Sequence, residues 1–356
     1  MGRGLGHVSQ AGKRLLRAAH HAPWLRCRQS PGLRPGSLLR LARTRAGRRS
    51  RRRRPGRHAL VTAALALLLA AGAGGCRHDS AAPTPEPPPA ATRPPAYDGS
   101  LPPAQAALAL VPAAATTLRV TDYDRVKAEL GVPDLSSASP PGDIATFWRR
   151  TSQVAVLTPG LLRPVDDRLE TGYGFGQADV AWEAVFAGPS GDGWVLRMKG
   201  NVPMAAVRRA VRARGGPLAG VEVDAAHHLV TRGAAGPGEP NWAARPGLAD
   251  LVGTLGLSTY AERGCRRGDS GGQRLQPLTA YAVEYAGTLA TARLGPDRDD
   301  LFARMRLGRS QREFSQVYTR GAADPSTGRI GYEMTDPPAA ARLALHHRLP
   351  FAVCEE

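Results

Sequence analysis

From about residue 104 onward, apolar and polar residues recur in the periods of helices and strands. Residues 118–120 predict a strand that runs into a helix, with Thr121 and Asp124 as a capping pair and Gly131 where the helix ends. The stretch "GDIATFWRRTSQ" predicts a second helix with Ile144 and Phe147 on its apolar face.

Residues 179–232 then predict a strand hairpin, a helix and a second hairpin. The turn "GPSGDG" separates two apolar strands, and "VPMAAVRRAVRARGG" is typical of a helix with Pro203 in its first turn and Gly215 at its end. The second hairpin is expected at 220–223 and 227–231. Together these elements form a β-β-α-β-β unit.

A similar order recurs toward the C-terminus. Residues 279–295 predict a strand pair, 297–308 a helix and 312–334 a hairpin, before a last helix that Asp336 caps. "AW…FAG" at 181–188 also matches "AY…YAG" 99 positions later. The pattern predicts an α+β fold of mostly antiparallel sheet, with helices on one side. One interpretation is a pair of pseudo-repeated β-β-α-β-β units, joined through residues 233–246. The two units could form one continuous sheet or two facing lobes.

The N-terminal quarter has a different character. A basic segment, "RRSRRRRPGRH", precedes the apolar run 59–71, and small residues then lead to Cys76. This order is typical of a secretory signal peptide, and "AGGC" resembles the lipobox, whose cysteine carries the lipid in bacterial lipoproteins, although Ala73 stands where Leu is usual. Cys76 is therefore the predicted lipid attachment site. A plain transmembrane anchor, or a secreted protein with a chance cysteine, is the alternative.

These features divide the chain into four segments. We expect a basic extension at 1–58, with a translation start inside this segment as the alternative. The signal peptide core and lipobox follow at 59–75. A proline-rich tether follows at 76–104, with nine prolines between Arg77 and Gln105. The globular domain is expected at 105–356, with halves at 105–232 and 247–356.

The net charge of +18 does not belong to the predicted domain. Residues 1–75 hold 17 of the 48 Lys and Arg and none of the acidic residues, which leaves 31 basic against 30 acidic residues. The sequence thus predicts no nucleic-acid partner for the globular domain. It favours a location on the extracytoplasmic face of the cell membrane.

Four cysteines remain to be assigned. Cys27 lies in the leader and Cys76 at the predicted lipid site, which leaves Cys265 and Cys354. In an exported domain these two are expected to form one disulfide, although two separate thiols are the alternative. Such a bond would fix the C-terminal "LPFAVC" to the segment "GCRRGDSGGQR".

That segment contains GDSGG, the motif around the nucleophile of trypsin-like proteases. A nucleophilic Ser270 would require an upstream histidine and an aspartate. His227 and His228 are only about 40 residues away, with Asp250 between them and the serine, and this spacing leaves no room for a second barrel. We therefore interpret GDSGG as a chance match in an exposed loop. The adhesion-type tripeptide Arg267-Gly268-Asp269 within it is likewise interpreted as a chance match in a chain rich in Arg and Gly.

Other chemistry-bearing residues are sparse. The pairs His227/His228 and His346/His347 have no Cys or carboxylate cluster to complete a metal shell, so no metal or cofactor is predicted. The tryptophans 148, 182, 194 and 242 could line a groove, but core packing is the commoner role of such residues.

"LVPAAATTLRVTDYDRV", "GYGFGQADVAWEA" and the ending "GYEMTDPPAAARLAL…LPFAVC", together with the lipobox, resemble uncharacterised lipoproteins of high-GC Gram-positive bacteria. The resemblance covers most of 105–356 and implies a location rather than a reaction.

The leading hypothesis is a non-catalytic, surface-anchored envelope lipoprotein that binds an unknown partner or ligand. An envelope hydrolase is one alternative, for which Asp179, Glu183 and Asp192 are the nearest group of carboxylates. A single-pass membrane protein with residues 1–58 as a basic cytosolic tail is the other.

Overall fold

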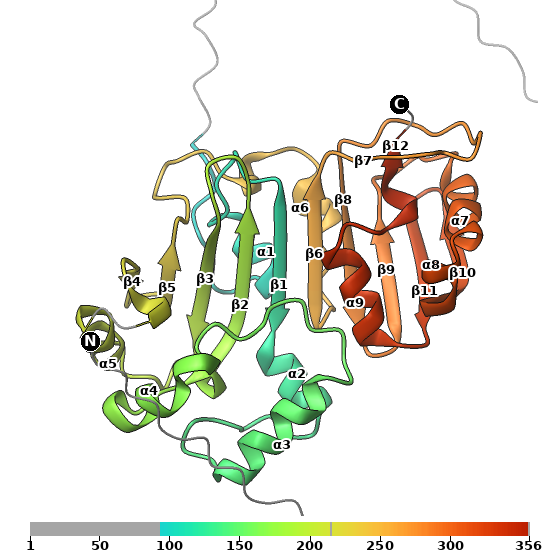
Figure 1. The fold of residues 1–356 in the computed structure, drawn as a ribbon. Coiled ribbons are helices and arrows are strands. Elements are labelled where there is room, and N and C mark those ends of the chain that lie inside the picture. Colours follow the sequence, from blue (N-terminus) through green and yellow to red (C-terminus); the bar gives the residue numbers. More distant parts are fainter. Residues whose placement is uncertain (1–92, 214–215, 355–356) are drawn as a thin grey trace, which may run out of the picture. The chain divides into compact units, whose positions relative to one another are not determined.

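The computed structural model describes residues 93–213 and 216–354 (Figure 1). In this part of the chain ten strands form one sheet, and every neighbouring pair is antiparallel. From one edge to the other the strands are β10 (Tyr318–Asp324), β11 (Arg329–Met334), β9 (Leu289–Arg293), β8 (Ala280–Ala286), β6 (Ser258–Arg263), β1 (Thr117–Asp122), β2 (Val180–Ala187), β3 (Gly193–Met198), β5 (Leu229–Arg232) and β4 (Glu222–Asp224).

Helices lie beside this sheet, so the predicted α+β class is confirmed. The α-helices of the described residues are α1 (Pro103–Leu108), α2 (Tyr123–Glu129), α3 (Pro141–Thr151), α4 (Asp166–Tyr173), α5 (Met204–Arg212), α6 (Leu248–Leu251), α7 (Leu301–Ser310), α8 (Arg312–Val317) and α9 (Pro337–Leu345). A separate short pair joins β7 (Arg266–Arg267) to β12 (Val353–Cys354) in parallel.

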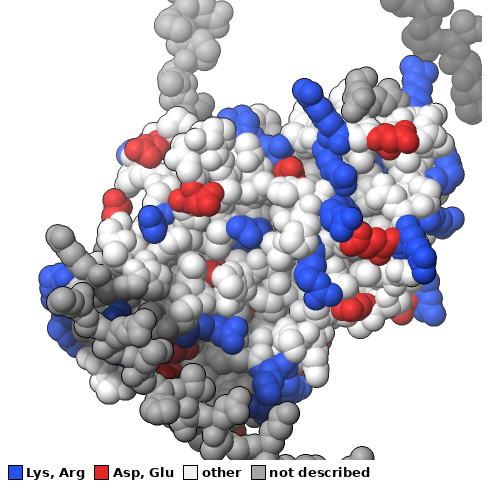
Figure 2. Space-filling view, in the orientation of Figure 1, with Lys and Arg blue, Asp and Glu red and all other residues white. Residues whose placement is uncertain are grey.

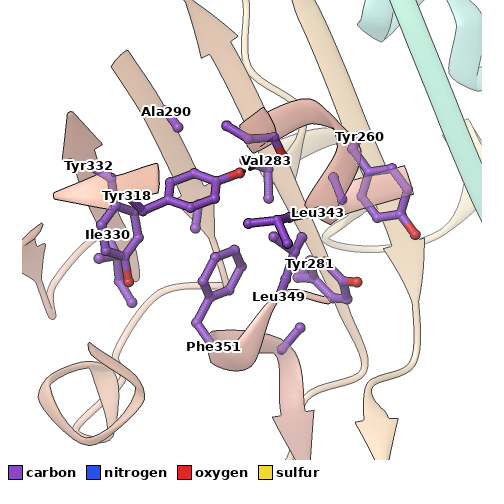
Figure 3. Close-up of a cluster of buried hydrophobic side chains, with 14 of the residues drawn as sticks. Tyr260, Tyr281, Val283, Ala290, Tyr318, Ile330, Tyr332, Leu343, Leu349 and Phe351 are labelled. Carbon is purple, nitrogen blue, oxygen red and sulfur yellow. Dashed lines mark hydrogen bonds between the residues drawn. The ribbon is translucent and has the colours of Figure 1, made fainter. Parts of the chain in front are cut away.

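Both faces of the sheet are covered, because successive side chains of a strand point to opposite faces. On one face Val120, Ala184 and Ala261 pack against the short helices α1 and α6. On the other face Leu196 and Val230 form a core with the helices of the first half. Val283 and Ile330 form a further core on that same face with α7, α8 and α9 (Figure 3).

The strand β6 joins the two halves of the domain into one continuous sheet. It pairs with β1 on one side and with β8 on the other. Outward from this central pair the order is β1-β2-β3-β5-β4 in one direction and β6-β8-β9-β11-β10 in the other. Along the chain the first half has β2, β3, α5, β4 and β5, whereas the second half has two helices, α7 and α8, between its two strand pairs. A duplication of one unit stays a prediction.

Several local predictions differ from the structure. The cap of α2 is Asp122, whose side chain accepts a hydrogen bond from the backbone N–H of Arg125. Thr121 is instead buried in the sheet, where its hydroxyl accepts hydrogen bonds from the backbone N–H groups of Leu157 and Thr158. Its tertiary partners compete with the local cap, so the capping pattern was wrong by one residue.

The expected hairpin at 312–334 begins with a helix. Residues 312–317 form α8, and only β10 and β11 form the hairpin. Phe314 of α8 is buried and stacks on Tyr318 with ring centroids 4.3 Å apart. The run "REFSQVY" places its apolar residues on one helical face, and this packing decides the local structure.

The C-terminal segment is fixed as expected. Cys265 and Cys354 form a disulfide with their Cα atoms 5.8 Å apart. The bond lies beside the β7–β12 pair, in which Val353 is paired with Arg266 and Cys354 with Arg267.

Candidate functional site

A hollow of about 350 Å³ lies at the β4–β5 edge of the domain. We call it the Tyr97 pocket. Its lining consists of Pro95, Ala96, Tyr97, Ala109, Leu110, Glu222, Val223, Asp224, His227, Leu229, Thr231, Ala234, Ala235, Gly236, Pro237, Gly238 and Asn241.

Three distant segments build the walls of the Tyr97 pocket. The backbone carbonyl of Pro95 accepts a hydrogen bond from Asn241 Nδ2 at 3.0 Å, which fixes the N-terminal segment against residues 234–241. The backbone N–H of Ala235 donates to the carbonyl of Leu110 at 2.9 Å. Part of the predicted tether, residues 93–104, is therefore a structural component of the domain rather than a spacer.

Asp224, the last residue of β4, forms a hydrogen-bonded pair with His227 in the turn that leads to β5. His227 Nδ1 lies 2.6 Å from Asp224 Oδ2, and Asp224 Oδ1 accepts hydrogen bonds from the backbone N–H groups of Ala226 and His227. Partial burial disfavours the carboxylate, but these hydrogen bonds outweigh it and hold the pKa of Asp224 below its ordinary value. Asp224 is therefore ionised at neutral pH.

Tyr97 covers one side of this pair. Its ring contacts the imidazole of His227 edge to face, with centroids 5.4 Å apart. Burial raises the pKa of Tyr97 against the opposing influence of Arg197, and the charge of Asp224 raises it further. The hydroxyl is thus neutral and can donate or accept a hydrogen bond at the pocket wall.

The lining combines apolar walls with acidic groups. Leu110, Leu229 and Pro237 contribute apolar surface, while Glu222 and Asp224 supply two carboxylates. A cavity of a few hundred Å³ with few polar groups on apolar walls is the usual form of a small-molecule site. The carboxylates select ligands that carry a cation or hydrogen-bond donors.

The structure does not assemble a serine protease site around GDSGG. Ser270 follows β7, whereas His227 lies in the β4–β5 turn, and Figure 1 shows these strands in separate parts of the domain. Asp269 Oδ1 accepts a hydrogen bond from the backbone N–H of Gly271, which closes a local turn. Asp250 lies on α6. The segment is a loop next to the disulfide.

The three carboxylates of the hydrolase hypothesis do not meet. Asp179 is buried and accepts hydrogen bonds from the backbone N–H groups of Ser137 and Gly176. Asp192 is exposed in the turn at the other end of the β2–β3 hairpin. Asp179 therefore holds local structure, whereas Asp192 faces solvent, and the two lie at opposite ends of the hairpin.

Glu183, the third member, is fully buried on β2. Its Oε2 accepts hydrogen bonds from the backbone N–H of Leu161 at 2.9 Å and from Gln177 Nε2 at 3.2 Å. Burial raises the pKa of Glu183 despite these hydrogen bonds. The side chain fixes the loop before α4 to the sheet, which is a structural role.

A second polar cluster surrounds Glu262 on β6. Glu262 Oε2 accepts hydrogen bonds from the hydroxyls of Tyr260 and Tyr281, and it lies 3.1 Å from His347 Nδ1. His347 follows α9 in a left-handed conformation, with φ at 55°. The cluster therefore attaches the end of α9 to the centre of the sheet.

The tryptophan candidates have structural roles as well. Trp182, Trp194 and Trp242 are at most 7% exposed and belong to the cores, as core packing predicts. His227 and His228 lie in a turn rather than on a strand. The described residues contain no group of three or more His, Cys, Asp or Glu placed to hold a metal ion.

Residues 1–58, the apolar run 59–71 and Cys76 lie outside the described residues. Among the helices that are described, none has both the length and the apolar character needed to span a bilayer. Figure 2 shows basic and acidic side chains interspersed on the viewed face, with Lys and Arg more numerous over the half that carries α7 and α9.

Comparison of the chain with protein-family models, with curated proteins and with solved structures finds no match.

The Tyr97 pocket was not predicted from the sequence. Its one readable signal is the spacing Asp224-x-x-His227, which lets an aspartate close a turn and hold the histidine that ends it. Tyr97 gives no such signal, because it lies in the predicted tether and reaches His227 only through the fold.

Proposed function

We propose that this protein is a lipid-anchored binding protein of the extracytoplasmic membrane face, which holds a small amine with an apolar body in the Tyr97 pocket. The observation that carries the proposal is the pocket itself, a hollow of about 350 Å³ with apolar walls and two carboxylates. An ammonium group would lie at Glu222 and Asp224, and the apolar body would contact Leu110 and Leu229.

The proposed location rests on the sequence and on the cysteine pair. A disulfide is typical of proteins that fold in an oxidising compartment. The signal-peptide pattern and Cys76 supply the route of export and the anchor. The intact mass of the protein purified from the membranes of its native host tests this part.

Two results separate the anchoring alternatives. A chain that begins at Cys76, carries lipid and gains about two daltons on reduction supports a lipoprotein with one disulfide. A chain without lipid that retains residues before Ala59 contradicts it. That result would favour a membrane protein whose basic segment, residues 1–58, lies in the cytosol.

Ligand binding is tested with matched small molecules. Thermal unfolding of the full chain in detergent is measured with phenethylamine, with the uncharged 2-phenylethanol and with the anionic phenylacetate. Phenethylamine should raise the melting temperature in proportion to the logarithm of its concentration, because it binds only the folded state. The alcohol should have a smaller effect and the acid none.

The double variant Glu222→Gln/Asp224→Asn should abolish the effect of phenethylamine, because both carboxylates become neutral. Asp192→Asn is the matched control, since it removes an exposed carboxylate outside the pocket. An equal response to all three compounds, or a response that the double variant retains, would exclude an acidic amine site. Consumption of an ester or amide probe would instead favour the hydrolase alternative.

A further inference from the structure

A second cavity, of about 150 Å³, lies at the β10–β11 edge of the sheet. We call it the Tyr332 cavity. Its lining consists of Met305, Arg309, Phe314, Ser315, Tyr318, Thr319, Arg320, Gly321 and Tyr332. The Tyr97 pocket adjoins β4, at the opposite edge of the same sheet, so the two sites are independent.

Aromatic rings form the floor of the Tyr332 cavity. The rings of Tyr318 and Tyr332 lie beside each other at the edge of the buried cluster in Figure 3, with centroids 5.5 Å apart. Phe314 meets the ring of Tyr332 edge to face at 5.4 Å. An engineered apolar cavity of roughly 150 Å³ holds benzene, so this volume suits one ring or a short aliphatic chain.

A β-bulge keeps the cavity open. The pairing of β10 with β11 shifts between Thr319 and Ala322, and Arg320 within the bulge has a φ of 48°. A Cβ at Gly321 would lie 3.0 Å from Met305 Cε and from Tyr332 Cε1, so the glycine preserves the space above the ring. Bulges and left-handed non-glycine residues gather where a fold positions functional side chains.

The hydroxyl of Tyr332 is buried and is not hydrogen-bonded to any described residue. The residue as a whole is only 6% exposed. Burial raises the pKa of Tyr332, so the group is a neutral O–H donor. Nearly all buried polar groups in proteins are hydrogen-bonded, so this hydroxyl is available to an acceptor supplied from outside the chain.

The charged groups of the lining are both cationic. Arg309 makes no ion pair with any described residue, and its charge acts on the hydroxyl of Tyr332. Arg320 pairs with Glu333 at 2.7 Å, but its side chain is 80% exposed, so water competes strongly for this pair. No acidic residue among those the structure describes lines the cavity.

From this geometry we infer that the Tyr332 cavity binds a small carboxylate with an apolar body about the size of one ring. The carboxylate accepts hydrogen bonds from the Tyr332 hydroxyl and the Arg309 guanidinium, while the body contacts Phe314 and Met305. Charge-assisted hydrogen bonds of this kind are stronger than neutral ones, and guanidinium groups match carboxylates in shape.

The chain offers a direct probe of occupancy. It contains five methionines, of which Met305 lines the cavity. With ¹³C-methyl methionine in the full chain in detergent, benzoate should shift the Met305 methyl resonance through its ring current. Met198 and Met204, in the other half of the domain, serve as internal controls. The variant Met305→Leu assigns the resonance.

Three comparisons test the chemistry. Benzyl alcohol and benzylamine keep the ring of benzoate but lose the anion, and each should bind at least about tenfold more weakly. Tyr332→Phe and Arg309→Gln should each weaken benzoate binding by about tenfold or more. Tyr332→Phe should fold normally because it removes an unpaired hydroxyl. Arg312→Gln, an exposed change outside the lining, should bind like the wild type.

The inference fails if benzoate leaves the Met305 resonance unmoved at concentrations that saturate small-fragment sites. It also fails if benzyl alcohol binds as tightly as benzoate, or if neither Tyr332→Phe nor Arg309→Gln changes the affinity. The first result denies the site, and the others deny recognition of a carboxylate.

Discussion

Gly253 and Glu284 show how single residues are constrained in this fold. Glu284 is buried on β8, where its carboxylate accepts hydrogen bonds from the backbone N–H of Leu255 and from Arg293 Nη2. A Cβ at Gly253 would lie within 2 Å of Glu284 Oε2. The loop after α6 can approach the carboxylate only because residue 253 has no side chain.

We expect Gly253→Ala to lower the free energy of unfolding by about 1–3 kcal/mol, because the loop or Glu284 must move. Urea unfolding followed by tryptophan fluorescence measures the change. Gly142→Ala is the matched control, since it lies in α3 with no atom within 4 Å of the new Cβ. It should be neutral or stabilise by up to about 1 kcal/mol. Equal effects of the two variants would contradict the packing argument.

Lys127 is a second constrained residue, and it makes stability depend on pH. Its side chain is buried, and Nζ donates to the carbonyl of Val180 and to Asp124 Oδ1, each at 3.1 Å. Burial lowers the pKa of Lys127 to about 8 despite the nearby charge of Asp124. Between pH 8 and the ordinary lysine pKa near 10.5, the unfolded chain therefore holds more protons than the folded one.

The contribution of Lys127 to stability should consequently rise with pH across this interval. We expect the wild type to gain about 1–3 kcal/mol relative to Lys127→Met between pH 7 and pH 10. Paired urea titrations at the two pH values measure this difference. Ser152→Ala, an exposed change without an ionisable group, should follow the wild type at both values. A constant difference between wild type and Lys127→Met would refute the lowered pKa.

At the scale of elements, Arg304 of α7 fixes the C-terminal segment. Its guanidinium is fully buried and donates to the carbonyls of Phe351, Val353 and Gln276 and to Asp300. Burial disfavours the charge of Arg304, but Asp300 compensates at 2.7 Å. One side chain thus connects a helix, a loop and the last strand.

Arg304→Ala should lower the free energy of unfolding by about 3–5 kcal/mol, because it leaves Asp300 and three carbonyls without this donor. Hydrogen exchange should show the loss first in the backbone around β12. Arg306→Ala on the same helix removes an exposed guanidinium that donates to Gln273 Oε1, and it should cost less than about 0.5 kcal/mol. A comparable loss in both variants would argue against a specific anchor.

Local sequence signals such as caps predicted those elements whose conformation is set by contacts within the element itself. Asp336 caps α9 as expected, since its side chain accepts a hydrogen bond from the backbone N–H of Ala339 at 2.9 Å. The strand β6 was missed, although it is central to the sheet. Its sequence "STYAER" mixes buried polar and apolar residues, because Ser258 and Thr259 are enclosed by neighbouring elements. No local period reveals such a strand.

At the scale of the whole molecule, the disulfide closes a loop between residues 89 positions apart. Cys265 follows β6 at the centre of the sheet, and Cys354 follows the segment that Arg304 holds. The bond therefore restricts the segment from β7 to β12, which is most of the second half of the domain, in the unfolded state.

Cys265→Ser/Cys354→Ser should lower the free energy of unfolding by about 4–5 kcal/mol on the loop-entropy account. The double variant avoids an unpaired thiol, and urea unfolding without reductant gives the difference from the wild type. Addition of reductant should destabilise the wild type alone. If the variant is as stable as the oxidised protein, the bond does not restrict the unfolded chain in this way.

Alternating and helical periods in the sequence determined the α+β class, because burial of one face imposes those periods on strands and helices. Counting cysteines, on the expectation that the chain is exported, predicted the pair that forms the disulfide. Tertiary structure alone decided that the two halves share one sheet, since that depends on the pairing of β6 with both β1 and β8. It alone brought Tyr97 to His227 and enclosed Tyr332, because contacts between residues far apart in the chain leave no local pattern.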